Sequence, residues 1–181
     1  GGKGLFTKEI EEALIDCRID IAVHSMKDAP TWRQPGLMLA TYLPREDVRD
    51  AFICSGYSGI DDLPQGAVVG SSSLRRRAQV LARRPDLQMV EFRGNVQTRM
   101  KKLADGVAEA TFLACAGLNR LGHDDAMIHS IEPGVMLPAV AQGAIGIEAR
   151  EADADTLALL APLDDTPTRQ RLDAERAFLT A

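Results

Sequence analysis

Apolar residues recur along this chain with two spacings, and the change from one to the other predicts alternating helices and strands. From Lys8 to Cys17 the apolar positions lie three or four residues apart, which is the period of a helix. The run 19–24 that follows is rich in Ile, Ala and Val and predicts a strand. Further strands are predicted at 37–43, 51–54, 68–69, 88–92 and 110–114.

Three more helices are expected among these later strands. The first covers 74–84, and Pro85 ends it. Asn95 can cap the second, and the third follows strand 110–114 and ends near Gly122. The apolar faces of the first two are predicted to consist of Leu74, Ala78 and Leu81, and of Val96, Met100 and Leu103.

Strands that alternate with helices of this length are typical of α/β units on a largely parallel sheet. Two segments resemble crossings between domains, because 43–47 ends a strand with a proline and charges, and 137–143 is rich in small residues. The middle of the chain is then a domain inserted into the first, a layout shared with two-lobed periplasmic-type binding proteins. The predicted division is domain 1 at 1–43 and 144–163, and domain 2 at 44–143 with hinges near 44–48 and 138–143.

The composition fits an ordinary globular protein, because 45% of the 181 residues are hydrophobic and 26% are charged. The longest weakly polar stretch, 135–147, is too short to span a bilayer, and no signal peptide is evident. The three cysteines are scattered without metal-ligand spacing. We therefore expect no metal site, and three small buried thiols in a reducing cytoplasm.

The net charge is −5, yet one segment is strongly basic. Between 74 and 102 lie nine Lys and Arg residues and only two acidic ones. An acidic protein with one basic segment favours a small anion as ligand over a nucleic-acid backbone. A single Trp and no aromatic interleaving also argue against the alternative of an RNA-binding module.

The segment His24-Ser25-Met26-Lys27-Asp28 follows a predicted strand. Ligands of α/β proteins bind beyond the carboxyl ends of strands, so Ser25, Lys27 and Asp28 are candidate ligand contacts. The plain alternative is a Lys27–Asp28 ion pair within a turn. His24 could act as a general base, but a histidine at a strand end is more often structural.

Two further strand ends run into helix starts that carry arginine, at Gly70-Ser71-Ser72-Ser73-Leu74-Arg75-Arg76 and at Phe92-Arg93-Gly94-Asn95 with Arg99 one turn later. Unpaired N–H groups and the helix dipole favour an anion there, whereas arginine in a first turn opposes the dipole. A bound anion resolves that conflict. Two such starts suggest a ligand with several carboxylates, which suit the planar guanidinium. One serine is also expected to act as an N-cap.

Taken together, these motifs resemble the porphobilinogen deaminase (hydroxymethylbilane synthase) family along essentially the whole chain. The matching segments are 24–28, 70–76, 92–96 with Thr98-Arg99, Ala116-Gly117-Leu118 with Arg120-Leu121-Gly122, and Leu137-Pro138-Ala139-Val140 with Gln142-Gly143-Ala144. The resemblance implies stepwise head-to-tail condensation of four porphobilinogen molecules with release of ammonia, on a dipyrromethane cofactor. It also implies an α/β fold of two-lobed type II periplasmic-binding-protein-like domains, with the third (α+β) domain missing from this chain.

By position, the resemblance makes Asp28 the catalytic carboxylate, which would stabilise cationic pyrrole intermediates. The residues expected to hold the acetate and propionate groups are Lys3, Ser25, Lys27, Ser71, Ser72, Ser73, Arg75, Arg76, Arg93, Arg99 and Gln142. Arg77 receives no role. Ala141 departs from the family, which usually has glycine beside this hinge.

The resemblance also implies that the chain is incomplete at both ends. Residues 164–181 would begin the connection to the third domain, where the family's cofactor cysteine lies; none of Cys17, Cys54 and Cys115 sits in that motif. The complete protein is expected to be a cytoplasmic monomer whose partner is porphobilinogen, with no nucleic acid or membrane. The main alternative is a non-catalytic two-lobed anion-binding protein, from which Asp28 distinguishes the enzyme.

Overall fold

The computed structural model describes residues 3–180, and side chains from 7 to 179. The chain forms two compact units: unit 1 comprises Gly1–Glu46 with Val140–Ala181, and unit 2 comprises Asp47–Ala139. The divisions fall within the segments 44–48 and 138–143; the role of these segments as hinges stays a prediction.

Unit 1 is built on a three-stranded sheet in the order β1 (Ile21–Ser25), β8 (Ile145–Arg150), β2 (Leu37–Tyr42). Because β8 pairs antiparallel with both neighbours, this sheet has no parallel pair. Helix α1 (Lys3–Ile15) packs on one face, where Leu14 contacts Ala22 and Leu37. On the other face α5 (Ala154–Leu160) places Leu160 against Ile147 and Ala149.

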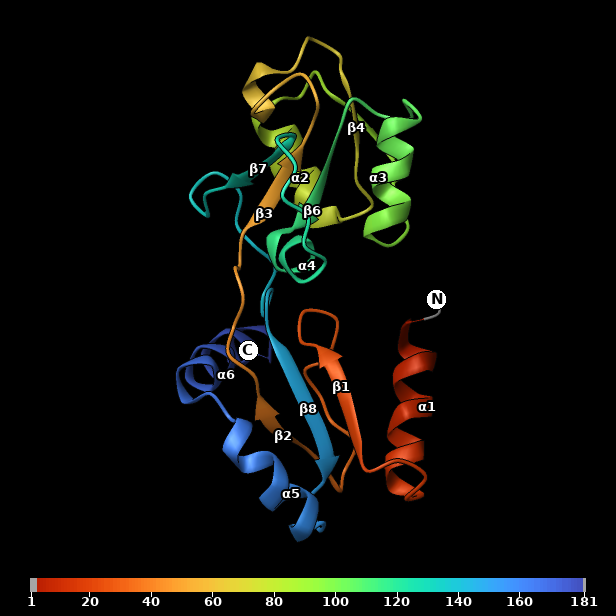
Figure 1. The fold of residues 1–181 in the computed structure, drawn as a ribbon, viewed down its shortest axis with the longest axis vertical. Coiled ribbons are helices and arrows are strands. Elements are labelled where there is room, and N and C mark those ends of the chain that lie inside the picture. The colour runs from red at the N-terminus through yellow and green to blue at the C-terminus, as the bar shows by residue number, and fades with distance from the viewer. Residues whose placement is uncertain (1–2, 181) are drawn as a thin grey trace. The chain divides into compact units, whose positions relative to one another are not determined.

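The C-terminal segment of unit 1 consists of η2 (Ala161–Leu163) and α6 (Thr166–Thr180). Leu172 of α6 is fully buried with Met26 and Tyr42, and the Asp165 N–H donates to the Tyr42 carbonyl at 2.8 Å. The described part of the segment predicted to begin a connection to another domain, residues 164–180, thus packs as part of unit 1. Figure 1 shows α5 and α6 beside β2, with α1 beside β1.

Unit 2 is a five-stranded mixed sheet in the order β5 (Gln88–Val90), β4 (Val68–Gly70), β6 (Ala110–Ala114), β3 (Asp50–Ile53), β7 (Ile128–Ile131). Strand β4 is parallel to β5 and β6, whereas β3 is antiparallel to β6 and β7. The helices are α2 (Leu74–Arg83), α3 (Val96–Ala104), α4 (Cys115–Arg120) and the short η1 (Ile60–Asp62).

The expectation of a largely parallel sheet is therefore wrong for unit 1 and holds for only part of unit 2. In unit 1 the middle strand comes from beyond the inserted unit and runs against both neighbours. Strand β7 was not predicted, because its four residues include two polar ones and give no clear period.

The predicted apolar face of α2 is also wrong. Leu74 is 83% exposed, and Ala78 and Leu81 also face solvent, whereas Arg76 and Val80 are buried. The helix is turned this way because Arg76 pairs with a buried carboxylate on β3, described below. A charged residue, rather than the apolar period, sets the face that α2 buries.

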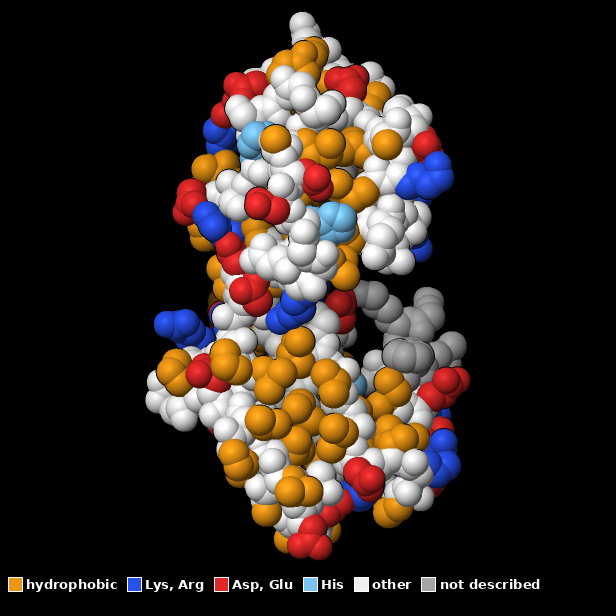
Figure 2. Space-filling model, in the orientation of Figure 1, with side chains coloured by type: hydrophobic (Ala, Val, Ile, Leu, Met, Phe, Trp, Pro, Cys, Tyr) orange, Lys and Arg blue, Asp and Glu red, His pale blue; other side chains and the backbone are white. Residues whose placement is uncertain are grey.

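Cysteine exposure differs from the expectation at one position. Cys54 and Cys115 are buried, but Cys17 is exposed just after α1, with a φ of 55°. None of the described helices is long and apolar enough to cross a membrane. Large apolar side chains do reach the surface of unit 1, where Val23 is 61% and Leu159 79% exposed, and Figure 2 shows an apolar patch on this unit.

Candidate functional site

Two helix starts lie next to each other at one edge of the unit 2 sheet. Strand β4 leads into α2 and β5 leads into α3, and the two strands are parallel neighbours with Gly70 opposite Val90. Ser73 caps α2 by accepting from the Arg76 N–H at 3.4 Å, as expected of one serine, and Asn95 caps α3 by accepting from the Thr98 N–H at 2.9 Å. Unpaired N–H groups of both first turns thus gather at this edge.

The first turn of α2 is tied to Asp50, the first residue of β3. Asp50 is 0% exposed, and its two oxygens lie 2.7 Å from Nη2 of Arg75 and 2.7 Å from Nη2 of Arg76. Arg76 Nη1 also donates to the Phe112 carbonyl at 2.9 Å, and Arg75 Nη1 donates to the Leu137 carbonyl. Asp50 was not predicted as a site residue, although a lone carboxylate directly before the apolar run 51–54 indicates that a buried cation must face it.

Arg99 brings a third guanidinium to the same place. Its side chain is half-buried in the first turn of α3, and Nε donates to the Gly94 carbonyl at 2.8 Å. Burial, and then repulsion from Arg76, lower the pKa of Arg99 below its ordinary value. Within the described part of the chain Arg99 pairs with no carboxylate, and the buried Nε of Arg76 has no hydrogen-bond partner. These cations exceed the single carboxylate beside them, so the site is electrostatically suited to an anion.

Other predicted residues of unit 2 are placed less directly. Ser71 is buried and accepts from the Ser73 N–H at 3.3 Å, and Ser72 accepts from the Phe92 N–H at 2.9 Å. A hydrogen bond from Ser72, together with Arg93 nearby, holds the pKa of Glu91 below its usual value. The Arg93 side chain is 86% exposed beside Glu91, so the structure does not draw it into the buried cluster.

Most of the remaining basic segment is neutralised locally, whereas Lys102 donates to the Arg93 carbonyl and lies over the Phe92 ring. Arg83 pairs with Asp61, Arg84 with Asp86, and Lys101 with Asp105, and Arg77 lies 3.3 Å from Glu91. These pairs match the simpler interpretation of a charge run as a solvated face. The anion-binding interpretation therefore rests on Arg75, Arg76 and Arg99.

The predicted residues of unit 1 lie on the turn after β1. Ser25 ends the strand, and Lys27 and Asp28 are exposed on the turn, where the Asp28 N–H donates to the Ser25 carbonyl at 3.0 Å. The Met26 N–H donates to the Ala144 carbonyl at 3.0 Å, which fixes the turn to the segment before β8. Lys3 is the first residue of α1, and its side chain lies outside the described residues.

In the segment before β8, Ala141 adopts a backbone conformation that favours glycine. Ala141 has a φ of 59°, the left-handed region that glycine occupies most easily. Its N–H donates to Glu175 Oε2 at 2.7 Å, and Glu175 also pairs with Arg45. Gln142 is 1% exposed, and its carbonyl accepts from Arg45 Nε at 3.0 Å. This burial does not support the predicted contact of Gln142 with a ligand, which stays a prediction.

Comparison with known protein families places the chain. The family model described as porphobilinogen deaminase, dipyrromethane cofactor binding domain, matches residues 1–158. The chain belongs to the porphobilinogen deaminase family.

Relatives within the porphobilinogen deaminase family match almost all of the chain. The porphobilinogen deaminase of Paracoccus denitrificans is 65% identical over 99% of this chain and 57% of its own length. The chloroplastic porphobilinogen deaminase of Oryza sativa subsp. japonica is 54% identical over 99% of this chain and 50% of its own length. The chain therefore spans little more than half the length of these relatives.

Solved structures bear on the fold. A periplasmic substrate-binding protein of an ABC transporter from Coxiella burnetii aligns with a TM-score of 0.51 at 14% identity, covering 91% of this chain and 79% of its own. An ABC transporter protein from Parabacteroides distasonis aligns with a TM-score of 0.53 at 13% identity, covering 89% of this chain and 57% of its own. The predicted α/β, two-lobed periplasmic-binding-protein-like fold is thereby confirmed.

Proposed function

We propose that this chain forms the substrate- and cofactor-binding part of a hydroxymethylbilane synthase. The complete enzyme is a transferase that condenses four porphobilinogen molecules head to tail and releases ammonia at each step. The observation that carries this proposal is the cluster of Arg75, Arg76 and Arg99, in which Asp50 pairs with Arg75 and Arg76 while Arg99 lies close enough to Arg76 to be repelled by it. Each pyrrole of substrate and product bears two carboxylates, which supply the missing negative charge.

The same residues fit a dipyrromethane cofactor. Arg76 has a buried N–H without a hydrogen-bond partner in the described part of the chain, and Arg99 is half-buried without a carboxylate. Arg75, Arg76 and Arg99 would hold its acetate and propionate groups, with Ser71, Ser72, Ser73, Arg93, Lys27 and Lys3 as further contacts. When bound, the cofactor supplies the pyrrole to which the first substrate is joined.

Asp28 would provide the catalytic carboxylate. Its exposed position, on a turn that the Met26 N–H fixes to the segment before β8, leaves it accessible to a pyrrole N–H. Loss of ammonia from porphobilinogen creates positive charge on the substrate pyrrole, and a fixed carboxylate stabilises that charge and can accept a proton. Ser25 and Lys27, on either side of Met26, would orient the substrate carboxylates.

The proposal is tested with Asp28→Asn in the complete enzyme. We expect bilane formation to fall by about 100-fold or more, the scale of lost electrostatic and general-base catalysis, with an unchanged melting temperature. Asp124→Asn, an exposed site in unit 2, is the matched control and should be active. If the Asp28→Asn variant is as active as the wild-type enzyme, the role of Asp28 is rejected.

The alternative of a non-catalytic anion-binding protein shares the fold and the arginine cluster. It predicts tight binding of porphobilinogen by the complete protein without release of ammonia. Measurement of ammonia alongside binding separates the two functions.

We also propose that the complete protein is a cytoplasmic monomer. Two buried, unpaired thiols support a reducing compartment. The name of the rice relative places that protein in the chloroplast, so fractionation of the source cells is the decisive measurement. Light scattering of the complete protein tests the monomer.

A further inference from the structure

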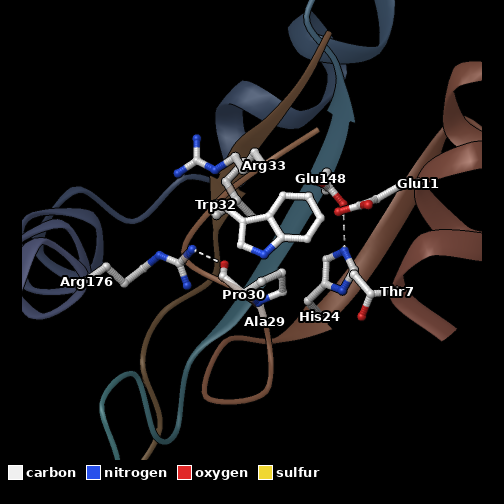
Figure 3. Close-up of a pocket in the computed structure, with 10 residues that line it drawn as sticks. Thr7, Glu11, His24, Ala29, Pro30, Trp32, Arg33, Glu148 and Arg176 are labelled. Carbon is white, nitrogen blue, oxygen red and sulfur yellow. Dashed lines mark hydrogen bonds and ion pairs between the residues drawn. The ribbon is translucent and has the colours of Figure 1, made fainter. Parts of the chain in front are cut away.

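A buried cluster of ionisable side chains lies in unit 1, apart from the arginines of unit 2. Glu11 comes from α1, His24 from β1 and Glu148 from β8, and all three line a small cavity of about 10 Å³, room for about one water molecule. Glu11 is 4% and Glu148 5% exposed, and His24 Nε2 lies 2.9 Å from Glu148 Oε2. Figure 3 shows the His24 ring below the two carboxylates, with Trp32 beside them.

These charges stand where an apolar contact would be expected. Ala22 and His24 alternate along β1 with the side chains that face water, and their register partners on β8 are Glu148 and Gly146. The same face is packed by α1 through Leu14. Burial, and then repulsion from Glu148, raise the pKa of Glu11, while His24 lowers it. Buried ion pairs rarely add stability over apolar replacements, so the cluster calls for another explanation.

The position of His24 supplies one. It is the last residue but one of β1, and the Ser25–Asp28 turn follows it directly. Beyond the turn, Arg176 of α6 donates to the Pro30 carbonyl, so the segment is held at both ends (Figure 3). Between these ends Met26 is 1% exposed, and a side chain on Gly146 would collide with its sulfur at 2.4 Å.

We infer that His24, bonded to Glu148 beside Glu11, is a positioning residue that fixes the end of β1 and thereby the aim of Asp28. The charged side chains that line the cavity with His24 are Glu11 from α1, Glu148 from β8, Arg33 from the loop after the turn, and Arg176 from α6. A cross-strand bond to Glu148 restrains both the rotation and the register of β1 at the residue from which the turn departs. The cluster can therefore orient Asp28 through the backbone of the turn, without a direct contact with its side chain.

This inference rests on the proposed function, and the test uses the complete enzyme. His24→Leu removes the bond to Glu148 and places an apolar side chain beside Ala22 and Leu39. His24→Gln keeps an amide N–H at nearly the position of Nε2. His129→Leu on β7 of unit 2 is the matched control.

We expect His24→Leu to lower kcat by about 10- to 100-fold, the cost of misplacing a catalytic group by roughly 1 Å. KM should change less than about twofold and the melting temperature should stay within a few degrees, because only the aim of Asp28 is altered. His24→Gln should restore kcat to within about threefold of wild type, and His129→Leu should match wild type.

Three results would overturn the inference: an unchanged kcat in His24→Leu, equal losses in His24→Leu and His24→Gln, or a loss that the fraction of unfolded protein accounts for. If His24→Leu does not fold, Glu148→Met breaks the same bond from β8 and the same criteria apply. An inactive wild-type enzyme would instead reject the proposed function, so the two failures are distinguishable.

Discussion

Asp50 shows how much one residue can determine. Its carboxylate is completely buried, and it meets the guanidinium groups of both Arg75 and Arg76 at 2.7 Å. It therefore fixes the face that α2 buries and the direction of two candidate anion-binding side chains. A buried carboxylate with two cations also leaves one positive charge uncompensated, which a ligand carboxylate can neutralise.

We predict that Asp50→Asn destabilises the protein by about 3 to 5 kcal/mol, the usual cost of removing one partner from a buried ion pair. Urea unfolding followed by circular dichroism measures this. Asp105→Asn, which removes the exposed partner of Lys101, is the control and should cost less than about 1 kcal/mol. Equal effects of the two substitutions would show that Asp50 is not the anchor of α2.

At the scale of elements, local sequence was sufficient wherever a cap or a period acts alone. The helix that Asn95 caps and the strands at 37–42 and 110–114 lie close to their predicted bounds. The face of α2 was missed because the ion pair of Arg76 with Asp50, 26 positions earlier, determines which side of the helix is buried, rather than Leu74 and Leu81. The direction of β8 was missed because strand pairing is a long-range property that no local period contains.

The candidate site was predictable to a similar extent. The sequence motifs predicted the arginines at two helix starts. Of these, Arg75, Arg76 and Arg99 lie together in the structure. Residues that act through burial, namely Asp50, Glu11 and Glu148, carry no local signal beyond being charged within or beside apolar runs. Their partners come from other elements, so only the fold reveals them.

Helix α1 provides a pH-dependent prediction at this scale. Burial raises the pKa of Glu11 above its ordinary value of 4.5, so ionised Glu11 opposes the docking of α1 on the sheet. A raised carboxyl pKa stabilises the fold below the unfolded-state pKa, and that contribution is lost as pH rises through the folded-state pKa. Glu11→Gln should therefore stabilise the protein at pH 7 to 8 and have no such effect near pH 4.

Thermal melts at several pH values check this prediction. Glu9→Gln, an exposed position on the same helix, is the control and should show no pH-dependent gain. A gain for Glu11→Gln that is the same at pH 4 and pH 8 would contradict the assigned cause.

At the scale of the whole molecule, the chain holds the arginine cluster in unit 2 and the Asp28 turn in unit 1, and spans little more than half the length of its relatives. Cys54 and Cys115 are buried, and burial raises the pKa of the Cys115 thiol, which makes it a poor nucleophile. The family resemblance leads us to expect that none of the three cysteines anchors the cofactor.

We predict that residues 1–181 expressed alone bind porphobilinogen but form no hydroxymethylbilane. A tethered primer makes each coupling effectively intramolecular, and the resemblance implies that the anchoring cysteine lies in the third domain. The experiment supplies porphobilinogen, assays bilane and uroporphyrin, and examines the protein by mass spectrometry, with the complete enzyme as the control. Sustained turnover, or a dipyrromethane adduct on Cys17, Cys54 or Cys115, would contradict the prediction.

The strand order of unit 1 constrains how the chain can fold as it is synthesised. Strands β1 and β2 do not pair with each other; each pairs only with β8. Ile21, for example, cannot pair until its register partner Ala149 has been synthesised. All of unit 2 emerges from the ribosome before β8 does, and its own pairings are already available. Unit 2 is therefore free to fold first, while the first two strands of unit 1 keep open edges until the chain has grown past Arg150.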